Sequence, residues 1–176
     1  MSYPRWSFFP RNIYPPTWAS DLVDVTTRVE KQISTVGDEV RLTSDAVLRE
    51  LRPELESLGF IVETSKTRAG KIRRPVLFGE NGKPRVSYEI DAFHDEFGIA
   101  VEVEAGRGVA NNADYRNIVR TALILDATYL VLFMPIYYRT ANSVTQGYKR
   151  TLEQLDAIYA SRRLQLPFRG ILLVGY

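Results

Sequence analysis

The chain has 176 residues, the size of one ordinary domain, and its 45% apolar and 25% charged residues are typical of a soluble globular protein. It contains no cysteine and one histidine, His94, which excludes a disulfide framework, a thiol nucleophile and a Cys-based zinc site, and argues against a Ser-His-Asp triad. Any metal would therefore be held by oxygen ligands. The longest apolar run is too short for a membrane span, so we expect a soluble, cytoplasmic protein with no membrane partner.

The patterns of apolar and turn residues predict the elements in chain order. Residues 1–19 are rich in proline and aromatic residues, which predicts an extended arm packed on the body or on a second subunit. Helices are expected over 20–36 and 43–58, then after a cap at Asn111 or Asn112, and over 143–161. The predicted strands are 60–64, 72–78, 85–93, 98–104, 129–134 and 170–174.

This order of elements predicts one α/β domain over 1–176 with a mixed sheet. The strand at 98–104, the helix after it and the strand at 129–134 form a βαβ unit, so the two strands should be parallel. In that helix we expect an inward face made of Ile118, Val119, Ala122, Leu123 and Leu125.

Acidic residues gather on one face of the predicted hairpin 85–104. Strand alternation places Glu89, Asp91, Glu102 and Glu104 opposite the apolar set, and a turn near Asp95 would set Glu89 across from Glu102. Like charges that meet on a sheet must be protonated, paired with basic residues or bound to a cation. Oxygen ligands suit Mg²⁺ or Mn²⁺, whereas an ordinary solvated face neutralised by nearby arginines is the alternative.

The segment Asp91, ten residues, then Glu102-Val103-Glu104 at the end of an apolar strand resembles the PD-(D/E)XK nuclease superfamily. The resemblance covers about 44–134. It implies an α/β, restriction-endonuclease-like three-layer fold in which helices flank a central mixed sheet. Glu104 stands where the family commonly has lysine, so the segment is similar to the Glu-x-Glu variant of some type II restriction endonucleases.

The same resemblance implies a role for each residue of the motif. Asp91 and Glu102 would hold Mg²⁺, for which Mn²⁺ can substitute, together with the backbone carbonyl of Val103. Glu104 would hold the attacking water or a second metal ion.

Further residues are assigned around this motif. Many family members add a glutamate from the preceding helix, for which Glu50 is favoured over Glu54. Basic residues beside the motif would neutralise the phosphates of DNA, although a solvated surface explains them too. The predicted nucleic-acid-binding residues are Lys71, Arg73, Arg74, Arg107 and Arg116.

The sequence therefore predicts a magnesium-dependent DNA endonuclease that acts as a homodimer, because cutting both strands of a palindrome takes two sites related by a twofold axis. Two alternatives stay open. One is a catalytically inactive, nuclease-fold subunit that binds DNA or serves assembly, because Glu104 is compatible with lost catalysis. The other is a small α/β interaction protein whose acidic patch is balanced by its own arginines.

Overall fold

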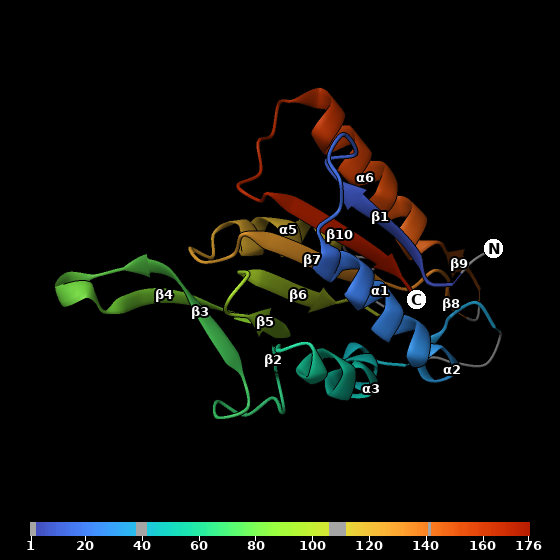
Figure 1. Ribbon diagram of the computed structural model, residues 1–176, viewed down its shortest axis with the longest axis horizontal. Coiled ribbons are helices and arrows are strands. Elements are labelled where there is room, and N and C mark those ends of the chain that lie inside the picture. The colour runs from blue at the N-terminus through green and yellow to red at the C-terminus, as the bar shows by residue number, and fades with distance from the viewer. Residues whose placement is uncertain (1–2, 38–41, 106–111, 141) are drawn as a thin grey trace.

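The centre of the molecule is a six-stranded mixed sheet with the order β1-β10-β7-β6-β5-β2 (Figure 1). The computed structural model describes residues 3–37, 42–105, 112–140 and 142–176. In the sheet β6, β7 and β10 are parallel, whereas β1, β5 and β2 pair antiparallel with their neighbours. Its strands are β1 (Arg5–Phe9), β2 (Ile61–Val62), β5 (Ala92–His94), β6 (Ile99–Val103), β7 (Tyr129–Met134) and β10 (Gly170–Gly175).

Helices cover both faces of this sheet. Along β7, Val131 and Phe133 pack into one apolar cluster and Leu130 and Leu132 into another, because successive side chains of a strand point to opposite faces. The first cluster includes residues of α1 (Thr17–Arg28), α2 (Glu30–Ile33) and α3 (Ser44–Ser57). The second includes residues of α5 (Ala113–Ala122) and α6 (Gly147–Ser161). The predicted three-layer α/β fold is thus confirmed.

Two small antiparallel pairs lie outside the central sheet. Strands β3 (Ile72–Phe78) and β4 (Pro84–Ile90) pair through a turn at η1 (Glu80–Gly82) and project from the body as the β3–β4 arm (Figure 1). Strands β8 (Tyr138–Arg139) and β9 (Val144–Thr145) form the second pair. Among the residues that the structure describes, no helix is long and apolar enough to cross a bilayer.

Several predicted elements are confirmed at their expected positions. The strands expected at 72–78 and 129–134 are β3 and β7, and β6 is parallel to β7. Helix α3 begins after Thr43, whose hydroxyl accepts a hydrogen bond from the Ala46 N–H at 3.2 Å, as an N-cap does. Just after α3, Gly59 has a φ of 90°, a conformation that favours glycine.

The N-terminal segment differs from the expected arm in two respects. Residues Arg5–Phe9 join the sheet as edge strand β1, which pairs with β10. An edge strand uses one row of backbone hydrogen bonds, so the prolines on either side of it are tolerated. Helix α1 begins at Thr17, three residues before the predicted start at Ser20.

The inward face predicted for α5 is wrong at three positions. Val119, Leu123 and Leu125 are 53%, 48% and 60% exposed, and only Ile118 of that stripe is fully buried. The side of α5 that faces the protein carries polar residues instead, among them Asp114 and Asn117. Val119 is exposed because the inner face of α5 is polar, whereas Leu123 and Leu125 lie beyond the end of the helix at Ala122.

Arg74 fastens the β3–β4 arm to the body. Its guanidinium pairs with Asp95 and, at 3.2 Å, with Asp126, and it lies 3.8 Å from the centroid of the Phe93 ring. The side chain is only 17% exposed. A partly buried cation with two carboxylates and an aromatic face contributes to stability as well as to charge.

We therefore expect Arg74→Ala to lower the free energy of unfolding by about 2 kcal/mol, because it removes a largely buried guanidinium together with its packing on Phe93 and its two ion pairs. In a chain of this size the melting temperature should fall by roughly 4–8 °C in thermal unfolding. Arg73→Ala, at the exposed neighbouring position, is the matched control and should change it little. Equal melting temperatures for the two variants would contradict this role of Arg74.

Candidate functional site

Asp91 marks the point at which the chain leaves the arm and enters the central sheet. The strand predicted over 85–93 is broken here: β4 ends at Ile90 and pairs with β3, whereas β5 begins at Ala92 and pairs with β6. One carboxylate oxygen of Asp91 accepts a hydrogen bond from the Val103 N–H at 2.8 Å. The carboxylate of Asp91 is thereby fixed at the carboxyl end of β6.

Glu102 and Glu104 stand at this same end of β6, and both are 9% exposed. The Glu104 carboxylate accepts a hydrogen bond from the Asn117 side-chain amide at 2.8 Å and one from Arg116 at 3.4 Å, both from α5. The backbone of Glu104 is held by its N–H, which donates to the Phe133 carbonyl at 2.9 Å. The structure thus places Asp91, Glu102 and Glu104 at the same end of β6, close enough to influence one another electrostatically.

The electrostatics of these carboxylates are unfavourable in the absence of a cation. Burial raises the pKa of Asp91 to about 6, against the opposing hydrogen bond from Val103. Burial, followed by the negative charge of Asp91, raises the pKa of Glu102 well above its usual range. Burial also raises the pKa of Glu104, although Asn117 and Arg116 oppose it. The fold therefore holds these carboxyl groups where their ionisation costs stability, which is common at functional sites.

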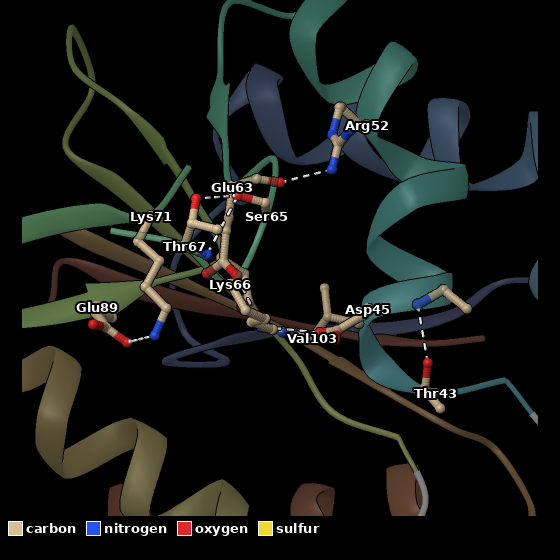
Figure 2. Close-up of polar contacts among 12 residues, drawn as sticks. Thr43, Asp45, Arg52, Glu63, Ser65, Lys66, Thr67, Lys71, Glu89 and Val103 are labelled. Atoms are coloured by element: carbon tan, nitrogen blue, oxygen red, sulfur yellow. Dashed lines mark hydrogen bonds and ion pairs between the residues drawn. The ribbon is translucent and has the colours of Figure 1, made fainter. Parts of the chain in front are cut away.

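Glu63 is a fourth carboxylate near the site, and it was not among the residues predicted from the sequence. It follows β2, is 5% exposed, and its N–H donates to the Asp91 carbonyl at 2.8 Å. Its carboxylate pairs with Lys66 at 2.8 Å, and Lys66 also pairs with Asp45 of α3 at 2.9 Å (Figure 2). The only signal in the sequence was an acidic residue directly after an apolar strand.

Glu89 does not belong to the acidic cluster, so the expected pairing of Glu89 with Glu102 is wrong. Its partner across the strands is Arg73 of β3, and its carboxylate pairs with Lys71 (Figure 2). The hydrogen bond from Lys71 lowers the pKa of Glu89. The break at Asp91 separates Glu89 from Glu102, because the residues before Asp91 pair with β3 whereas the residues after it pair with β6.

An open cavity lies between α3 and the segment after β2, and neither of the glutamates predicted on α3 is among the residues that line it. Glu50 pairs with its neighbour Arg49 at 3.5 Å, and Glu54 pairs with Arg28 of α1 at 3.0 Å. Asp45 of α3 does line this cavity, where its carboxylate pairs with Lys66. A catalytic role for Glu50 stays a prediction without a contact in the described residues to support it.

The predicted DNA-binding residues occupy different settings. Arg73 is exposed on the β3–β4 arm, whereas Lys71 and Arg74 on the same strand are paired with acids. Arg116 is 60% exposed and reaches Glu104. Arg107 lies outside the described residues.

The donor chemistry of the cluster fits a divalent metal ion. The carboxylates of Asp91, Glu102 and Glu104 are all oxygen donors, and a bound cation would relieve their mutual repulsion. In the part of the chain that the structure describes, no group of three acidic or histidine side chains is already arranged at metal-binding geometry. A metal would therefore draw these side chains together from positions that are now held by Val103 and Asn117.

Comparisons with known proteins bear on the family and the fold. Residues 13–176 match the sequence model of a family described as "Putative halobacteria restriction endonuclease". No curated protein matches the sequence.

Two solved structures of the restriction endonuclease BglII have a similar fold. The BglII complex with a DNA 16-mer has a TM-score of 0.58 at 15% identity, over 99% of this chain and 76% of that one. Free BglII has a TM-score of 0.52 at 12% identity, over 99% of this chain and 79% of that one. At this identity the likeness concerns the fold.

The raised pKa of Asp91 leads to a prediction on stability. Because its pKa is about 6 in the folded state against an ordinary value of 3.8, the carboxyl is protonated more readily when folded, and stability falls as the pH rises through this window. In metal-free buffer at pH 8, Asp91→Asn should therefore raise the free energy of unfolding by about 2–3 kcal/mol, and by little near pH 4. Chemical denaturation at both pH values measures this.

The Asp91→Asn change keeps a side-chain oxygen that can accept the hydrogen bond from Val103, so the variant alters charge more than shape. Asp24→Asn, at an exposed position of α1, is the control and should shift stability by less than about 0.5 kcal/mol at either pH. If Asp91→Asn instead lowered the free energy of unfolding at pH 8, the Asp91 carboxylate would not destabilise the metal-free protein, and the prediction would be wrong.

Proposed function

Since the chain belongs to the halobacterial restriction endonuclease family, we propose that it is a metal-dependent endodeoxyribonuclease that hydrolyses phosphodiester bonds of DNA. The observation that carries the proposal is the set of buried carboxyl groups of Asp91, Glu102 and Glu104 at the end of β6, whose pKa values are all raised by burial. A purely structural protein gains nothing from burying such charges, whereas a nuclease uses them to bind a cation at the scissile phosphate.

The positions of the residues support a separate role for each. Asp91 and Glu102 would hold Mg²⁺ or Mn²⁺ with the carbonyl of Val103. When bound, the cation would supply positive charge to the scissile phosphate and lower the pKa of a bound water. The carboxylate of Glu104, oriented by Asn117, would accept a hydrogen bond from the attacking water and direct it toward the phosphorus. Arg116, largely exposed beside Glu104, would neutralise a neighbouring phosphate.

The natural partner would be duplex DNA bound by a homodimer. Two copies are needed to cut both strands of a twofold-symmetric sequence. The exposed Tyr115 and Val119 of α5 and Leu123 at its C-terminal end follow one another at a spacing of four residues and form an apolar stripe that a second copy can cover. The β3–β4 arm, with Arg73 exposed upon it, would lie along the DNA backbone.

Cleavage is tested directly with supercoiled plasmid and purified protein in Mg²⁺ or Mn²⁺. The wild type should nick or linearise the plasmid, and Glu104→Ala should reduce the single-turnover rate by about 10²-fold or more, because the attacking water loses its acceptor. DNA affinity should remain near that of wild type, or increase as repulsion from the phosphate is removed. Glu153→Ala, at an exposed position of α6, is the matched control and should cleave normally.

A wild-type protein that binds DNA but never cleaves it would favour the inactive nuclease-fold subunit. A Glu104→Ala protein that cleaves as fast as wild type would instead remove Glu104 from the mechanism.

Metal binding gives a second prediction that does not depend on the DNA sequence. Millimolar Mn²⁺ should raise the melting temperature of the wild type by mass action. At a hundredfold excess over Kd, the free energy of unfolding should increase by about 2.7 kcal/mol. The rise should be larger at pH 8 than at pH 5, because Asp91, with a pKa of about 6, must lose its proton to bind. Asp91→Asn should abolish the rise and Asp24→Asn should keep it. An equal rise in both variants would locate the metal elsewhere.

A further inference from the structure

An open cavity lies beside the acidic site, between α3 and the segment that follows β2. It measures about 250 Å³. Its basic and hydroxyl-bearing lining residues are Arg49, Arg52, Lys66, Thr64 and Ser65. Basic groups and hydroxyls together are the groups with which proteins bind phosphate.

Lys66 is held in this cavity by two carboxylates. Its ammonium lies 2.8 Å from Glu63 and 2.9 Å from Asp45, so that residues of α3 and of the segment after β2 converge on it (Figure 2). Burial alone would lower the pKa of Lys66, but the hydrogen bonds to these acids outweigh it and raise the pKa, so the ammonium stays charged. An ammonium has three N–H donors, of which the described acids take two. The side chain is 57% exposed, so its remaining donor is accessible to a ligand.

One residue that lines the cavity, Glu63, is hydrogen-bonded to a motif residue. The N–H of Glu63 donates to the carbonyl of Asp91 at 2.8 Å. Burial raises the pKa of Asp91, and the charge of Lys66 is among the effects that lower it. Lys66 therefore lies within electrostatic reach of the carboxylate that would hold the metal ion.

DNA that approaches the site needs positive charge on this side. The end of β6 carries Glu102 and Glu104 and would repel a phosphate. The arginines of α5 are bonded on the opposite face of the sheet: Arg116 pairs with Glu104, and Arg120 donates to the carbonyl of Glu89. On the α3 side, Lys66 is anchored by two carboxylates and its side chain is 57% exposed, whereas Arg49, which lines the same cavity, pairs with Glu50 at 3.5 Å.

We propose that Lys66 contacts a backbone phosphate of bound DNA, with Glu63 and Asp45 holding its ammonium in place beside Asp91. This proposal rests on the proposed nuclease function and extends the site from the end of β6 to α3. The contact places the DNA strand over Asp91 and Glu102 and offsets the repulsion between their charges and the phosphates.

The test measures DNA binding and cleavage separately. Binding of a fluorescently labelled duplex is followed in Ca²⁺ over a range of salt concentrations, and plasmid cleavage is followed in Mn²⁺ under single-turnover conditions. Lys66→Ala should reduce the slope of log K against log salt by about one, as expected for one lost phosphate contact. The cleavage rate should fall by roughly 10–100-fold. Lys66→Arg should restore the slope and part of the rate, and Lys31→Ala of α2 is the charge-matched control.

Lys66→Ala leaves Glu63 buried without its cation and can destabilise the fold. The double variant Glu63→Gln with Lys66→Gln removes both charges and keeps two groups that can hydrogen-bond, and it should show the same lower slope and rate. Thermal unfolding checks that each variant is folded.

The outcomes separate this proposal from the proposed function. If the wild type cleaves and a folded Lys66 variant keeps both the slope and the rate, the nuclease function stands and the role of Lys66 is wrong. If the wild type never cleaves but loss of Lys66 still lowers the slope, the phosphate contact stands and the nuclease function fails. An unchanged slope in a protein that does not cleave would overturn both.

Discussion

The hydrogen bond between the Val103 N–H and the Asp91 carboxylate, at 2.8 Å, is the contact on which the arrangement of the site depends. It lies where the chain passes from the β3–β4 arm into the central sheet. The backbone carbonyl of the same aspartate accepts the N–H of Glu63, so one residue links the arm, the end of β2 and the end of β6. A backbone donor partly compensates the burial of this charge, which allows the fold to keep Asp91 beside Glu102.

The residues around this contact include buried polar and acidic side chains where apolar packing would be more stable. On α5, Asn117 and Asp114 are buried while Val119 is exposed, so the inner face of the helix is polar. Asn117 on this face donates a hydrogen bond to Glu104. The Thr151 hydroxyl of α6 donates to Asp114 at 3.0 Å and satisfies a further buried carboxylate. The metal-free fold thus bears an electrostatic cost that a bound cation would offset, in the manner of sites where function and stability conflict.

Local patterns were sufficient for some features and insufficient for others. Strand β7 was predictable because every residue is apolar, and the carboxylates of Glu102 and Glu104 because alternation on β6 sets their face. The exclusion of Glu89 was not predictable, because a bend after Ile90 leaves no mark in the alternation. Glu63 and Lys66 lie near the site because β2, which precedes them, pairs with β5. The sequence shows neither this pairing nor which residues of α3 lie beside it. These are properties of tertiary packing.

The location of the metal ion is the most direct test of the account. Crystals grown with Mn²⁺ and measured for anomalous scattering would show its position without any knowledge of the DNA sequence. We expect one peak at coordination distance, about 2.0–2.3 Å, from oxygens of Asp91 and Glu102 and from the carbonyl of Val103. A protein saturated with Mn²⁺ whose peak lies elsewhere, such as beside Asp95 and Asp126 at the other end of β6, would contradict it.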